Sequence, residues 1–115
     1  MIVALSLAAS AHVGLPLMPL EMRGVWDVAG HCTLPSDDSD SRIIVRENNA
    51  VFWETVFTPK RILTPDVLNW TATGVFSEEG EVSKGRLNLR LSRDKRTLSY
   101  TNSDNHVVLL VRCKK

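Results

Sequence analysis

Cysteine and histidine are scarce in this chain of 115 residues, with two and three copies respectively. The histidines His12, His31 and His106 lie far apart, and the chain contains neither a Cys-x-x-Cys pair nor a closely spaced histidine pair. Zinc sites usually draw on such pairs. The sequence therefore predicts no metal centre.

The motifs of common enzyme classes are also missing. The chain has no Gly-rich phosphate loop and no Gly-x-Ser-x-Gly elbow around a nucleophile. The adjacent carboxylates Glu78 and Glu79 lie in a stretch typical of a turn, where we expect solvation rather than the cleft that a glycosidase pair needs. We predict a protein without catalytic residues and without a cofactor.

Long apolar runs are absent, apart from the first eleven residues, which are too few to cross a bilayer. This stretch ends in Ala9-Ser10-Ala11, which is similar to the cleavage site of a secretory signal, although no Lys or Arg precedes it. We interpret residues 1–11 as the remnant of a signal peptide and expect a periplasmic or secreted protein without a membrane span. The alternative is an ordinary first helix or strand.

Residues 12–20 combine large apolar side chains with Pro16 and Pro19. Two prolines three residues apart prevent a regular helix or a central strand, so we expect an extended arm. The arm either covers an opening of its own domain, which we favour, or inserts into a partner. Its candidate partner-binding residues are His12, Val13, Leu15, Leu17, Met18 and Leu20.

Residues 21–115 show the pattern of short strands separated by polar turns. Apolar side chains recur at every second position, most clearly at Leu87, Leu89 and Leu91. Seven or eight such strands predict an all-β domain, an antiparallel meander closed into a barrel. The run richest in β-forming residues begins at Ala50, and we expect Thr58-Pro59 to interrupt it.

The two cysteines flank the first and last expected strands. Cys32 follows the strand that starts at Gly24, and Cys113 follows the strand 106–112. A disulfide between them suits a closed sheet without exposed edges and an oxidising compartment. In the chain-entropy model such a bridge contributes about 4–5 kcal/mol. Two free buried thiols are the alternative.

The acidic loop 35–41 raises the question of a calcium site. Counted from Asp38, the sixth position is Ile43 rather than Gly, and the twelfth is Asn49 rather than Glu. The loop therefore fails the EF-hand pattern, and we favour a solvated turn.

Charge is balanced overall but unevenly distributed. Residues 1–80 carry a net charge of −5, whereas residues 81–115 carry +6. The basic segment lacks exposed aromatic side chains for base stacking, so we expect no nucleic-acid partner. It could contact anionic glycans or lipids, although a mixed solvated surface is the simpler interpretation. The possible anionic-surface contacts are Lys84, Arg86, Arg90, Arg93, Lys95 and Arg96.

Glu54 lies among apolar neighbours in the strongest expected strand. If it points inward, it needs a partner such as an Arg, or it anchors a ligand in a cavity. An eight-stranded barrel is just wide enough to be filled by side chains or to hold one small ligand. A filled interior is favoured by the aromatic residues Trp26, Trp53, Trp70, Phe57 and Phe76.

Gly24-x-Trp26 at the start of the first strand resembles the motif of lipocalin-like barrels, in which this Trp plugs one end. The layout is also similar to that of bacterial alkaline metalloproteinase inhibitors. This resemblance implies eight strands, a structural plug at Gly24 and Trp26, and an N-terminal arm that enters a protease active site. In those inhibitors the bridge lies early in the barrel, whereas Cys113 is far from Cys32 here.

Three functional hypotheses remain. The first is an exported, non-enzymatic, monomeric barrel that binds a protein or a cell-envelope component through its surface. The second is a periplasmic protease inhibitor that inserts the arm 12–20. The third is a small-ligand carrier of calycin type.

Overall fold

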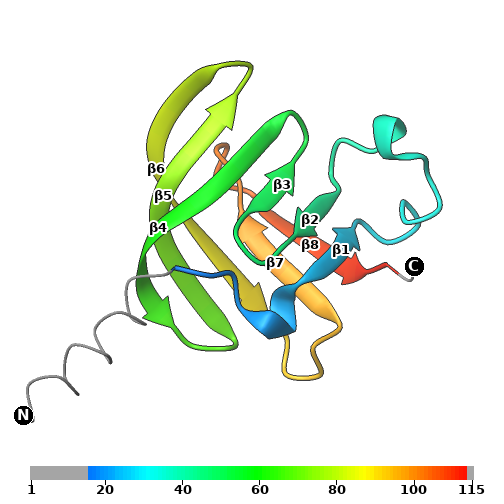
Figure 1. The fold of residues 1–115 in the computed structure, drawn as a ribbon. Coiled ribbons are helices and arrows are strands. Elements are labelled where there is room, and N and C mark those ends of the chain that lie inside the picture. Colours follow the sequence, from blue (N-terminus) through cyan, green and yellow to red (C-terminus); the bar gives the residue numbers. More distant parts are fainter. Residues whose placement is uncertain (1–15, 114–115) are drawn as a thin grey trace, which may run out of the picture.

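A computed structural model describes residues 16–113, which form eight antiparallel strands closed into a barrel (Figure 1). Consecutive strands pair with each other, and β1 also pairs with β8. The expected all-β meander and its closure are confirmed. The elements are η1 (Leu20–Met22), β1 (Gly24–Asp27), η2 (Ser36–Asp38), β2 (Ile43–Val45), β3 (Ala50–Phe52), β4 (Thr55–Pro65), β5 (Asn69–Glu78), β6 (Glu81–Leu91), β7 (Thr97–Thr101) and β8 (Val107–Arg112).

A disulfide fastens the β1–β8 seam. Cys32 and Cys113 are bridged, with a Cα–Cα distance of 5.4 Å and a sequence separation of 81. The backbone N–H of Cys113 also donates a hydrogen bond to the carbonyl of Val25, at 2.8 Å. The predicted bridge is confirmed, and it is consistent with an oxidising compartment.

Inward-facing side chains fill the middle of the barrel. Leu87, Leu89 and Leu91 are buried, as their alternation predicts. Trp26 is fully buried, and its indole N–H donates to the carbonyl of Met22 at 2.8 Å. Because Met22 belongs to η1, this bond fixes η1 to the first strand. The buried apolar cluster comprises Met18, Met22, Trp26, Ile43, Val45, Ala50, Phe57, Trp70, Ala72, Leu87, Leu89, Leu91, Leu98 and Leu110.

The expected strand from Ala50 to Thr58 is in fact two strands. Trp53 and Glu54 form the turn between β3 and β4, and Glu54 adopts a left-handed φ of 59°. Both side chains are exposed. The hypotheses that placed Trp53 in the interior and Glu54 inside the barrel with a partner are therefore wrong. Neither residue is typical of turns, so the sequence gives no sign of a turn within this run of β-forming residues.

β4 also continues through Thr58-Pro59, where we expected an interruption. The register of β4 against β5 shifts between Pro59 and Arg61, which marks a bulge. Bulges accommodate proline because the ladder there does not need its missing N–H. As a result β4, β5 and β6 contain 11, 10 and 11 residues, and they extend beyond the shorter strands in Figure 1.

Candidate binding site at the open edge of β6

β6 is paired along almost its whole length on one side and only near its end on the other. β5 pairs with it from Glu81 to Arg90. β7 pairs with it at Arg90 and Leu91. Within residues 16–113 no further strand pairs with this second side, so residues 81–89 of β6 form an open edge.

Neighbouring hydrogen bonds show which backbone groups lie on the open edge. The N–H of Leu91 donates to the carbonyl of Leu68, next to β5, at 3.0 Å. The register between β5 and β6 has no shift, and hydrogen-bonding direction alternates along a strand. The backbone groups of Lys84, Arg86 and Asn88 therefore face the open edge.

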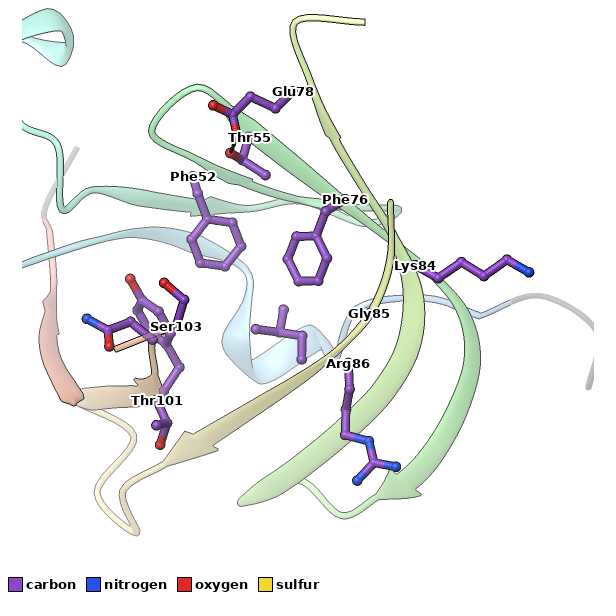
Figure 2. Close-up of a pocket in the computed structure, with 12 residues that line it drawn as sticks. Phe52, Thr55, Phe76, Glu78, Lys84, Gly85, Arg86, Thr101 and Ser103 are labelled. Atoms are coloured by element: carbon purple, nitrogen blue, oxygen red, sulfur yellow. Dashed lines mark hydrogen bonds between the residues drawn. The ribbon is translucent and has the colours of Figure 1, made fainter. Parts of the chain in front are cut away.

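A cavity of about 590 Å³ lies beside this edge, between β6 and the end of β7 (Figure 2). Its apolar lining includes Phe52, Phe76, Leu87 and Tyr100, and its rim includes Ser103 in the β7–β8 turn. The rings of Phe52 and Tyr100 meet edge to face, with centroids 5.5 Å apart. We call this cavity the β6–β7 notch. The expectation of a filled interior holds for the middle of the barrel and does not extend to the notch.

Two facing glycines make room for the ring of Phe76 at the notch and for the ring of Phe57 in the core behind it. Gly74 and Gly85 are cross-strand partners. A Cβ on Gly85 would lie 2.6 Å from Cε2 of Phe76, and one on Gly74 would lie 2.2 Å from the backbone oxygen of Thr58 and 2.9 Å from Cζ of Phe57. The two rings therefore use space that side chains would otherwise fill, and they pack with centroids 4.8 Å apart. The glycines thus help to set the shape of the notch wall.

The outer face of the same strands is basic. Arg86 lies opposite Thr73, which in turn lies opposite Arg61. In the described part of the chain, all ion pairs involve Asp27, so the cations of this face form none. The exposed cations of β4 and β6 are Lys60, Arg61, Lys84, Arg86 and Arg90.

The structure divides the six predicted anionic-surface contacts into two exposed groups. They lie on the outer face of β6 (Lys84, Arg86 and Arg90) and in the β6–β7 turn (Arg93, Lys95 and Arg96). Sequence reasoning missed Lys60 and Arg61, which reach the same face only because β4 pairs with β5 and β5 with β6. No local sequence signal connects these two residues with β6.

Gly24 and Trp26, the proposed plug, lie on the β1–β8 seam. Gly24 has a φ of +133°, which favours glycine. The guanidinium of Arg112 lies over the Trp26 ring at 4.2 Å and donates to the carbonyls of Glu21 and Arg23, at 2.8 and 3.0 Å. Trp26 is therefore held from both sides, by the core and by a cation. These contacts indicate a structural role for the pair.

The arm is described from Pro16 onward. His12, Val13 and Leu15, all proposed as partner-binding residues, lie outside the described residues. The N–H of Met18 donates to the carbonyl of Glu47 at 2.8 Å, and its own carbonyl accepts from the Arg23 guanidinium. Met18 is buried, whereas Leu17 and Leu20 are 40% and 70% exposed. The described part of the arm is thus anchored to the barrel at Met18, through its buried side chain and its backbone hydrogen bonds.

A buried carboxylate lies beneath the loop between β1 and β2. Asp27 is fully buried and accepts hydrogen bonds from the hydroxyls of Ser39 and Ser41, both at 2.6 Å, from Arg42 at 3.0 Å and from the N–H of Val28 at 2.7 Å. Burial alone would raise the pKa of Asp27, but these hydrogen bonds outweigh it and keep the pKa below its ordinary value. The group is fully partnered, which suits a structural anchor.

The acidic loop is only partly the solvated turn that we expected. Asp37, Asp38 and Asp40 are exposed, but Ser39 between them is buried against Asp27. In residues 16–113 no three His, Cys, Asp or Glu side chains are grouped as metal ligands. The loop therefore packs through its serines.

Comparisons with family models, with curated proteins and with solved structures find no match to this chain. The resemblance to lipocalin-like barrels and to metalloproteinase inhibitors therefore stays a prediction. The described residues contain no helix long and apolar enough to cross a membrane.

Proposed function

We propose that this protein is an exported, non-enzymatic binding module that holds a segment of a partner protein at the open edge of β6. The observation that carries the proposal is the combination of an unpaired strand edge with an apolar cavity beside it. Extended segments bind to strand edges through main-chain hydrogen bonds, and adjacent pockets select their alternate side chains. The disulfide supports export.

The chemistry of the notch supports binding. Phe52, Phe76 and Leu87 offer apolar contact area, which contributes about 25 cal/mol per Å² when water is removed from it. Burial raises the pKa of Tyr100, so its hydroxyl stays protonated at neutral pH and acts as a hydrogen-bond donor or acceptor. These groups suit the recognition of a chain segment.

Capture from periplasmic extract with a matched pair of variants tests this proposal. Ser103→Trp introduces a large side chain at the rim of the notch, whereas Asp104→Trp introduces it at the next exposed position of the same turn, which does not line the notch. The wild-type protein and Asp104→Trp should retain the same partner, and Ser103→Trp should lose it. Equal capture by all three proteins would contradict the proposal.

A small-ligand carrier is the second candidate, because the notch volume of about 590 Å³ lies within the usual range of ligand pockets. Native mass spectrometry of the purified protein distinguishes the two functions. A carrier should retain a small molecule that Ser103→Trp lacks, whereas the proposed module should retain none and still capture a protein.

A further inference from the structure

The open edge of β6 presents two chemically different faces. Gly85 and the buried Leu87 line the notch. Figure 2 shows the side chains of Lys84 and Arg86 pointing away from it. Successive side chains of a strand point to opposite faces of the sheet. A strand added along this edge would therefore place one set of side chains in the notch and the other set beside Lys84 and Arg86.

We infer that the partner segment is an extended strand in which acidic side chains alternate with apolar or aromatic ones. This inference rests on the proposed function and adds the chemistry of the partner. The apolar set fits against Phe52, Phe76 and Tyr100, and the acidic set lies beside Lys84 and Arg86. Opposite charges on adjacent strands stabilise the pairing, and like charges in the same place destabilise it.

Charge argues against a second copy of this chain as the occupant. In an antiparallel pair of copies centred on Gly85, Lys84 of each copy would lie opposite Arg86 of the other. Two such repulsive pairs disfavour self-association, in the way that charged residues protect strand edges in many proteins. The same cations attract an acidic strand. The charges of Lys84 and Arg86 thus both disfavour pairing between two copies and favour an acidic partner.

The position of the acidic residues in the partner is also constrained. Glu81 and Glu78 are cross-strand partners at the start of β6 and the end of β5. Both lie on the same face of the sheet as Gly85 and Leu87, and Glu78 lines the notch. They would repel an acidic side chain in the set that enters the notch, so the acidic residues of the partner should lie in the other set, beside Lys84 and Arg86.

A synthetic peptide of the pattern Ser-Phe-Glu-Val-Glu-Phe-Ser tests the inference, with binding to the oxidised full chain measured by fluorescence anisotropy. Replacing both Glu residues by Gln should weaken binding roughly two- to thirtyfold, and replacing them by Lys should weaken it further. The difference between the Glu and Gln peptides should shrink as salt is raised, because exposed charges are screened.

Arg86→Glu and Arg93→Glu form a matched pair on the protein. Both arginines are exposed and the change of charge is the same, but Arg93 lies in the β6–β7 turn. Because Lys84 remains, Arg86→Glu should reduce or abolish the preference for the Glu peptide over the Lys peptide, whereas Arg93→Glu should preserve it. An equal effect of both variants on peptide preference would mean that the peptide responds only to the overall charge of the protein, and this result would overturn the inference.

N-methylated peptides test the strand geometry. One peptide carries N-methyl groups at its even positions and another at its odd positions, so that each blocks a different edge of the added strand. Only one of the two should lose binding, because only one edge faces β6. Equal binding of both, or no binding by any peptide, overturns the inference. If partner capture still depends on Ser103, the proposed function survives that failure.

Discussion

Replacing Asp27 by Asn tests how the loop between β1 and β2 is held against the barrel. One carboxylate oxygen accepts from Val28 and Ser41, and the other from Ser39 and Arg42. An Asn amide nitrogen would replace one of these two acceptors. A serine hydroxyl can rotate to accept from that nitrogen, but the N–H of Val28 or the guanidinium of Arg42 cannot. At least one buried donor therefore loses its acceptor.

The expected cost of Asp27→Asn is about 2–4 kcal/mol of unfolding free energy. An unsatisfied buried donor costs about 1–3 kcal/mol, and loss of the charge that faces Arg42 adds to it. The cost is limited because the guanidinium of Arg42 still donates hydrogen bonds to the carbonyl oxygens of His31 and Leu34, both at 2.8 Å. Asp38→Asn, at an exposed position of the same loop, is the control and should change stability by less than about 0.5 kcal/mol.

The pH dependence gives a second readout. The pKa of Asp27 is lowered in the folded protein, so its stabilising contribution is complete above its ordinary pKa of about 4. This contribution is lost as the pH falls through the lowered pKa that Asp27 has in the folded protein. Urea unfolding, followed by tryptophan fluorescence from neutral pH to about pH 2, should show the wild type converging on Asp27→Asn. A loss below about 1 kcal/mol at neutral pH, or a difference that does not narrow with acid, would refute the reasoning.

Three further perturbations have defined outcomes. Reduction of the Cys32–Cys113 bridge should lower the unfolding free energy by about 4–5 kcal/mol in urea melts, and the intact mass under non-reducing conditions should be lower than that of the reduced protein by two hydrogen atoms. Trp26→Ala should cost about 3–5 kcal/mol, and a loss below about 1 kcal/mol would contradict its role in the core. Deletion of residues 12–20 should lower the melting temperature because it removes the buried Met18, and an unchanged value would favour the arm as a free binding element.

The fold could be predicted from the sequence wherever a single interaction determined the local structure. The alternation of Leu87, Leu89 and Leu91 required an inner face, and two cysteines allow one intramolecular pairing. The prediction was wrong at Trp53-Glu54. These two residues form a hairpin turn in which Glu54 has a left-handed backbone conformation, although neither residue is typical of turns. At Pro59 a bulge lets β4 continue, and this bulge could not be predicted without knowing how β4 pairs with β5.

The sequence indicated the cations of the candidate site, Lys84 and Arg86, but neither its open edge nor its notch, because both arise from strand pairing. The open edge exists because β6 runs far beyond its pairing with β7. A signal for the notch was glycine inside a strand pattern, which indicates close approach of another group. Gly74 and Gly85 do face each other beneath aromatic rings. The burial of Asp27 likewise depends on the fold of the following loop, whose Ser39 packs against it.

Two seams of the barrel have equally little strand pairing but opposite properties. β1 pairs with β8 at two positions, and so does β6 with β7. The first seam is reinforced by a disulfide and by the guanidinium of Arg112 over Trp26. The second seam opens into an aromatic cavity with a free strand edge. Because the disulfide secures the first seam, the proposed addition of a strand at the second seam would not require the barrel to open.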